Sequence, residues 1–148
     1  MDHVVYLDAS AHELENLLSG RKTMILRGAA GRKLPHGRVK EGDMLYFLNN
    51  NGEGFVRAQA RVKSVLNSEA LTKEESTRLA ESHQPRLQLT EKQLKRWGGK
   101  RYLVLIEVEG VKQIEAFQVD KRNFGNMDDW LPVGDIEDVK LQGLVRSR

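Results

Sequence analysis

The chain has 148 residues, of which 39% are hydrophobic, and a formal net charge of +3. This size and composition predict one globular domain with a buried core, and no apolar run approaches the roughly 20 residues of a membrane-spanning helix. The absence of cysteine excludes disulfides, thiolate metal ligands and cysteine nucleophiles. The N-terminus lacks the basic and apolar segments of a signal peptide. We therefore expect a cytoplasmic protein that does not associate with membranes.

The first half of the sequence predicts one short helix and three strands. Ser10 and Glu13 form a capping-box pattern. This pattern opens a helix over residues 11–19, which ends at Gly20. A glycine-rich, basic loop is expected over residues 28–42, after the first strand. The strands are predicted from compact apolar runs and from alternation of apolar and polar residues. They cover residues 23–27, 44–48 and 55–66.

The second half predicts a helical insertion followed by more strands. Residues 69–98 are helical in character, and Thr72 and Thr90 each stand three residues before a Glu or Gln, as in a capping box. The expected strands are residues 101–109 and 112–119, forming a hairpin around Gly110. This order of elements predicts an α+β fold, a small and mostly antiparallel β-barrel with helical insertions.

Charge is distributed unevenly along the chain. Residues 20–40 hold seven Lys and Arg residues and no acid, whereas residues 128–138 hold five acids and no base. A glycine-rich loop with many cations adapts well to a sugar-phosphate backbone. The basic segment therefore predicts a contact with an anionic ligand.

The segment around residue 20 resembles the signature of the ASCH family, which is part of the PUA-like superfamily of small β-barrels. The family pattern is roughly G-x-K-x-x-[acid or Thr]-x-R, and this chain has Gly20, Lys22, Ile25 and Arg27 at the corresponding positions. A Gly-Asp turn at residues 42–43 and a later Leu-Ile-Glu-Val strand follow in the family's order. The resemblance covers about residues 12–110, and it implies a PUA-like barrel with a cleft beside the first strand.

The resemblance also implies binding of RNA or of modified nucleosides. We expect a binding module for RNA, a nucleotide or a modified nucleoside, with a basic cleft beside the Gly-Arg-Lys-Thr strand into which Lys22 points. Trp97, among several cations, is a candidate for stacking on a base. The expected nucleic-acid-binding residues are Lys22, Arg27, Arg32, Lys33, Arg38, Lys40 and Trp97.

An alternative is an amidohydrolase that acts on an acetylated nucleoside such as N4-acetylcytidine. One bacterial branch of the family catalyses this reaction with a Lys, a Thr and a Glu, and Lys22 matches the Lys. Ile25 stands where the Thr would be, so Thr23 would have to replace it, and Glu81 is our choice for the acid. Because Thr23 is displaced along the strand, we expect binding without turnover.

A second alternative is a protein-interaction adaptor whose acidic, aromatic tail, residues 124–139, docks a protein partner. The four histidines have no spacing typical of a metal site, so we expect no metal and no cofactor. The whole chain, residues 1–148, is expected to form a single domain, with residues 120–148 as a C-terminal extension that packs on the barrel.

Overall fold

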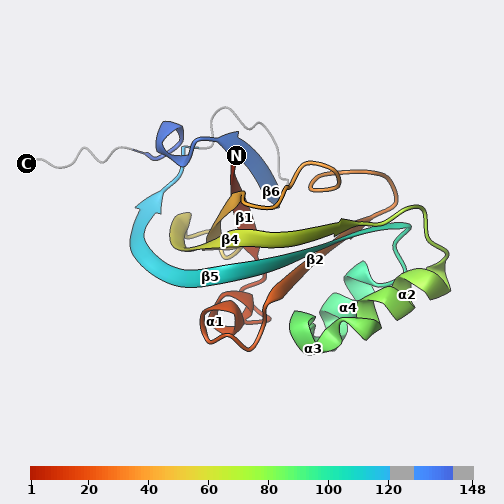
Figure 1. The fold of residues 1–148 in the computed structure, drawn as a ribbon. Helices are drawn as coiled ribbons and strands as arrows, with labels where there is room; N and C mark the ends of the chain where they lie inside the picture. Colours follow the sequence, from red (N-terminus) through yellow and green to blue (C-terminus); the bar gives the residue numbers. More distant parts are fainter. Residues whose placement is uncertain (121–128, 142–148) are drawn as a thin grey trace, which may run out of the picture.

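The computed structural model describes residues 1–120 and 129–141, and these form one curled sheet accompanied by short helices (Figure 1). The sheet has six strands in the order β2-β5-β4-β3-β1-β6. The strands are β1 (Asp2–Leu7), β2 (Met24–Ala29), β3 (Met44–Asn49), β4 (Phe55–Asn67), β5 (Tyr102–Gln118) and β6 (Trp130–Gly134). The helices are α1 (Glu13–Leu18), α2 (Lys73–Ser82), α3 (Gln84–Leu87), α4 (Glu91–Trp97) and the 3-10 turn η1 (Ile136–Asp138).

The sheet is a curled half-barrel, and the predicted α+β, mostly antiparallel, PUA-like architecture is confirmed. Strands β1 and β3 pair in parallel, and every other neighbouring pair is antiparallel. The long strands β4 and β5 bend together around the molecule (Figure 1). Their pairing register shifts at three places. Each such irregularity adds local twist and bending, which explains why the sheet curls instead of lying flat.

The hairpin predicted around Gly110 is wrong. Residues 102–118 form the single strand β5, and both of its halves pair with β4, as in Val62 opposite Val108 and Phe55 opposite Gln118. Gly110 has a φ of 61°. A glycine takes this angle at little steric cost, so the strand bends at this residue without reversing. The sequence pattern of strand, glycine, strand fits both outcomes.

Two of the three predicted capping boxes are confirmed. The Thr72 and Thr90 side chains accept from the backbone N–H groups of Glu75 and Gln93, whose side chains accept from the threonine N–H groups in return. The capping box at Ser10 is wrong. Helix α1 begins at Glu13 after His12, which has a left-handed backbone and no capping side chain.

The carboxylate of Glu13 turns back and accepts from the backbone N–H of Asp8 at 2.9 Å. Glu13 is only 2% exposed. The residue expected to cap the helix therefore lies in the interior, where its charge needs a partner.

The N-terminal strand β1 has no counterpart among the predicted elements, yet it lies between β3 and β6 inside the sheet. Strand β6, from the C-terminal extension, completes that edge by pairing with β1. The backbone N–H of Ile136 also donates to the Asp2 carboxylate at 2.8 Å. The described part of the extension, residues 129–141, thus packs on the sheet, whereas residues 121–128 and 142–148 of the predicted extension lie outside the described residues.

Helices α2 to α4 are inserted between β4 and β5 and gather at one end of the molecule (Figure 1). An apolar cluster joins them to β2 and β5, with Leu26, Ala80, Leu87 and Leu103 fully buried. This packing brings the end of α3 and the end of α4 close to β2. Within residues 1–120 and 129–141, no helix has the length and apolar character needed to cross a membrane.

Candidate functional site

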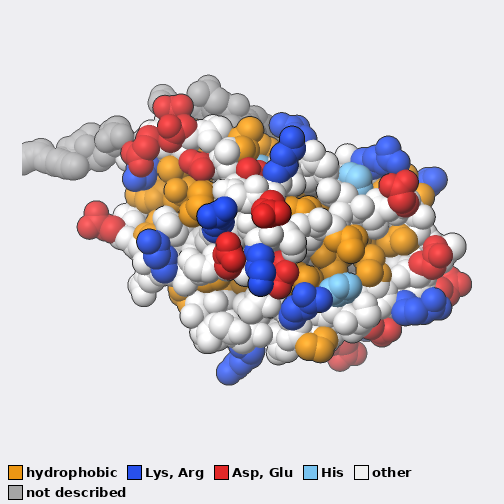
Figure 2. All heavy atoms as spheres, in the orientation of Figure 1, with side chains coloured by type: hydrophobic (Ala, Val, Ile, Leu, Met, Phe, Trp, Pro, Cys, Tyr) orange, Lys and Arg blue, Asp and Glu red, His pale blue; other side chains and the backbone are white. Residues whose placement is uncertain are grey.

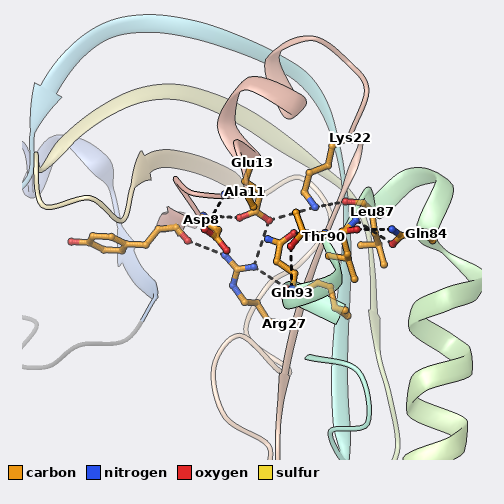
Figure 3. Close-up of polar contacts among 12 residues, drawn as sticks. Asp8, Ala11, Glu13, Lys22, Arg27, Gln84, Leu87, Thr90 and Gln93 are labelled. Atoms are coloured by element: carbon orange, nitrogen blue, oxygen red, sulfur yellow. Dashed lines mark hydrogen bonds and ion pairs between the residues drawn. The ribbon is translucent and has the colours of Figure 1, made fainter. Parts of the chain in front are cut away.

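The charged side chains of Glu13, from α1, and of Lys22 and Arg27, from residues 20–27, meet in the interior beside β2 (Figure 3). The Lys22 ammonium lies 3.4 Å from the Glu13 carboxylate, and the Arg27 guanidinium lies 3.9 Å from the same oxygen. Lys22 also donates to the Leu87 carbonyl at the end of α3, at 2.5 Å. Lys22 is 1% exposed and Arg27 is 6% exposed. We call Glu13, Lys22 and Arg27 the buried triad.

The protonation of Lys22 reflects this environment. Burial lowers the pKa of Lys22 below its ordinary value, because the charged form loses its hydration. The neighbouring Glu13 carboxylate acts in the opposite direction and raises this pKa, while the Arg27 cation lowers it. Lys22 therefore depends on Glu13 to carry its charge inside the protein.

Arg27 is held by several contacts, and its Nε is a hydrogen-bond donor without a partner among the described residues. Its two terminal nitrogens donate to the carbonyls of Leu26 and Tyr6 at 2.8 and 2.9 Å. Its guanidinium carbon lies 5.5 Å from the ring centre of Trp97 and 6.0 Å from that of Trp130, distances typical of cation–π contacts. The Arg27 Nε is buried and has no hydrogen-bond partner in the described part of the chain. A water molecule or a ligand atom that accepts a hydrogen bond would satisfy this donor.

A shallow surface hollow is bordered by Glu13 and Arg27 of the triad, and its empty space of about 230 Å³ includes open solvent. Its lining carries three carboxylates and two guanidiniums, together with two amides and two aromatic rings, and we call it the mixed-charge hollow. The ion pair between Arg96 and Asp129, at 3.3 Å, belongs to its rim. The lining residues are Tyr6, Asp8, Glu13, Arg27, Asn50, Gln93, Arg96, Trp97 and Asp129.

The mixed-charge hollow suits a polar group that carries both donors and acceptors. A uniformly cationic surface would favour phosphate, but here the acids balance the guanidiniums. The buried amide of Gln93 and the half-buried ring of Trp97 stand in the same lining. Proteins bind an unpaired nucleobase through hydrogen bonds to its edges and through an aromatic side chain that stacks on its face.

The structure brings some of the predicted binding residues together and separates others. Arg27 and Trp97 both line the mixed-charge hollow, and Arg96 covers the Trp97 ring at 4.2 Å. Lys22 is not among the described residues that line it, because its ammonium points to the Leu87 carbonyl and to the triad. The four predicted loop cations, Arg32, Lys33, Arg38 and Lys40, are exposed.

The basic character of the loop is local. Figure 2 shows that Lys and Arg side chains on the visible face are interspersed with Asp and Glu, so this face is not uniformly basic. Arg32 lies over the ring of Tyr102 at 5.3 Å, next to the edge of the sheet. Contacts with an anion therefore depend on the residues of the loop and not on a broad field.

Of the three residues predicted for catalysis, Glu81 makes no ion pair with Lys22 and no hydrogen bond with Thr23 within the described residues. Thr23 is half-buried, and its backbone bonds to Arg86 and Val108. Glu81 is exposed on α2, in a shallow surface depression with Lys73 and Arg78. The carboxylate that contacts Lys22 is that of Glu13, which the sequence reasoning assigned to a helix cap. The signal available for Glu13 was its position beside Leu14 on the apolar face of a short helix.

No three His, Asp or Glu side chains within residues 1–120 and 129–141 gather closely enough to hold a metal ion.

The structure is similar to solved structures of an ASCH protein from Zymomonas mobilis. That protein matches with a TM-score of 0.66 and 14% sequence identity, over 95% of this chain and 96% of the other. A substituted variant of it matches with a TM-score of 0.68 and 15% identity, over 93% of each chain. No protein-family model and no curated protein sequence matches this chain. Since likeness at this level of identity concerns the fold, the conclusion is that this chain has the ASCH-type fold that residues 20–27 and the order of its elements predicted.

Proposed function

We propose that this protein is an RNA-binding module that takes a nucleobase into the mixed-charge hollow and the adjoining backbone onto the loop of residues 28–40. The observation that carries the proposal is the convergence of Arg27, with its free Nε donor, and the Trp97 ring at one small polar hollow. The ASCH-type fold supports the same class of ligand.

The lining explains why a base is favoured over a simple anion. A base presents donors, acceptors and a flat face together, and the hollow offers carboxylate acceptors, guanidinium donors and an indole ring. Stacking on an aromatic side chain contributes about 1–3 kcal/mol per base. Trp97 is half-buried, and the exposed Arg96 side chain, whose guanidinium lies 4.2 Å from the ring centre, would have to move aside for a base to stack on this ring.

The loop supplies affinity of a different kind. Its four exposed cations, Arg32, Lys33, Arg38 and Lys40, stand in a segment without any acid. Contacts of this type with phosphates release counterions, so the affinity falls as salt increases, and they carry no information about the base.

Replacing Arg32, Lys33, Arg38 and Lys40 together with Ser should weaken binding of single-stranded RNA and reduce its dependence on salt. The slope of log affinity against log salt should decrease by about 0.7 for each phosphate contact that is lost. Fluorescence anisotropy with a labelled RNA of mixed sequence, measured over a series of salt concentrations, gives both quantities.

The matched control removes four exposed cations elsewhere, Lys63, Arg78, Lys92 and Lys112, none of which lines the mixed-charge hollow. It has the same net charge as the loop variant and should keep most of the affinity. Equal losses in the two variants would show only nonspecific attraction. If RNA does not bind the unmodified protein even at low salt, the proposed function is wrong.

The buried pair of Lys22 and Glu13 favours a second candidate, the amidohydrolase, because a desolvated lysine beside a carboxylate is a common catalytic arrangement. We expect no or very weak hydrolysis of N4-acetylcytidine. The side chain of Ile25 is fully buried and has no hydroxyl, and the Lys22 ammonium is occupied by the Leu87 carbonyl. Release of cytidine from the nucleoside, followed by chromatography, measures this directly. Robust turnover that disappears in Lys22→Ala would contradict the expectation.

A further inference from the structure

We propose that a second hollow, between the loop of residues 28–36 and Tyr102, is a phosphate subsite, and that the ligand is therefore a nucleic-acid strand and not a free nucleoside. The inference rests on the proposed function, because it assigns the phosphate next to the base in the mixed-charge hollow.

This hollow is shallow, since its empty space of about 180 Å³ includes open solvent, and no carboxylate is among the described residues that line it. Its charged lining residues are Arg27 and Lys33, and we call it the cationic hollow. The two hollows therefore differ in charge, because three carboxylates line the mixed-charge hollow. The lining residues are Arg27, Gly28, Ala29, Gly31, Lys33, Leu34, Pro35, His36, Tyr102 and Val104.

Tyr102 concentrates two further cations at this hollow. The guanidinium carbons of Arg32 and Arg101 lie 5.3 and 5.7 Å from the centre of its ring. The ring of His36 meets Tyr102 edge to face at 5.6 Å, and a His36 ring nitrogen bonds to the Ser68 carbonyl at 2.9 Å. The tyrosine ring therefore lies among cationic and donor groups from both the loop and the start of β5. A guanidinium binds phosphate through paired N–H donors, and an aromatic ring orients it for this role.

The loop is fixed to the sheet on the side of this hollow. Besides the bond of His36 to Ser68, the backbone N–H of Gly37 donates to the Asn67 side chain at 2.9 Å. Both partners lie at the end of β4, where that strand leaves the sheet. A positioned loop loses less entropy on binding than a free one, so its cations contribute more affinity.

Arg27 connects the two hollows, because it lines both of them. Its Nε is the orphaned buried donor of the site. A base in the mixed-charge hollow and a phosphate in the cationic hollow would thus both contact Arg27, as two parts of a single nucleotide can. A free nucleoside would fill only the first hollow and leave the second without its anion.

The test compares the affinities of ligands that differ only in phosphate. The probes are the four ribonucleosides, their 3′,5′-bisphosphates and inorganic phosphate, each titrated against the intact protein by calorimetry at low salt. The unmodified protein should bind at least one bisphosphate at least about tenfold more tightly than its nucleoside, because hydrogen bonds to charged phosphate oxygens are stronger than those to neutral groups. Inorganic phosphate should compete with that bisphosphate.

The variant Lys33→Ala/Arg101→Ala removes two exposed cations of the subsite, and it should lose this preference while keeping the affinity for the nucleoside. Lys92→Ala/Lys112→Ala, with the same change of charge away from both hollows, should keep the preference. Equal binding of nucleoside and bisphosphate by the unmodified protein, or an equal effect of the two double variants, overturns the subsite and leaves the proposed function standing. Absence of binding by every probe and by single-stranded RNA overturns both.

Discussion

Replacing Glu13 with Gln should lower the free energy of unfolding by about 3–5 kcal/mol, because it leaves Lys22 and Arg27 as buried cations without a counter-charge. Gln has nearly the same size and can still accept the N–H of Asp8, so packing and that hydrogen bond are preserved. The loss therefore measures the electrostatic part of the buried triad. Urea unfolding followed by tryptophan fluorescence gives the free energy.

The cost should also depend on pH. Burial lowers the pKa of Lys22, and Glu13 is the group that raises it, so the variant lowers the folded-state pKa further, while the unfolded chain keeps a value near 10.5. The unfolded state then binds more protons than the folded state between those two values. Stability rises with pH in such a window. The loss of stability caused by Glu13→Gln should accordingly be largest at neutral pH. It should shrink as the pH rises towards the pKa of a lysine in the unfolded chain.

The matched control is Glu15→Gln, on the same helix but exposed. It should change the free energy of unfolding by no more than about 0.5 kcal/mol. The double variant Glu13→Gln/Lys22→Met should recover part of the loss, since it removes one of the unpaired charges. If Glu13→Gln costs no more than Glu15→Gln, the triad does not stabilise the fold as described.

Replacing Trp130 with Ala should lower the free energy of unfolding by about 3–5 kcal/mol, the usual cost of removing a large buried aromatic ring. Trp130 is 1% exposed and belongs to the core cluster inside the curled sheet. It also contacts the guanidinium of Arg27 and anchors β6 against β1. The substitution thus opens a cavity and loosens the described part of the C-terminal extension.

A polar chain adds to this anchor. The indole N–H of Trp130 donates to Nδ1 of His3 at 3.1 Å, so the proton of the neutral imidazole lies on Nε2, which donates to Asp43 at 2.8 Å. Burial lowers the pKa of His3 and favours this neutral form. Trp130→Phe keeps an apolar ring but leaves Nδ1 of His3 without its donor, so it should cost about 1–3 kcal/mol.

A comparison of Trp130→Ala with Trp97→Ala distinguishes the structural role expected for Trp130 from the binding role proposed for Trp97. Trp97 is half-buried, so its removal should destabilise the protein less than that of Trp130 but weaken RNA binding more. Urea unfolding and anisotropy with labelled RNA measure the two effects. If Trp130→Ala leaves the free energy of unfolding unchanged, the extension contributes little to the fold. The adaptor hypothesis, in which the tail docks a protein partner, would then gain support.

The sequence by itself determined the elements whose hydrogen bonds are local. The capping boxes at Thr72 and Thr90 join residues three positions apart, and the strand predicted at residues 55–66 is found at Phe55–Asn67. Likewise, the glycine, lysine and arginine of residues 20–27, together with the order of the predicted elements, indicated the ASCH-type fold. Such features depend on side-chain type, spacing and backbone preference, all of which can be read along the chain.

Only the tertiary structure decided which of these residues form a site. Lys22 faces a carbonyl 65 positions away, and Trp130 reaches a histidine 127 positions away. Glu13 matched a capping box in sequence, but the chain before α1 turned it inward to meet two cations. Contacts of this range depend on how the helices between β4 and β5 pack on β2 and on where β6 returns to β1. That packing is the sum of many small apolar contacts, and no local pattern encodes it.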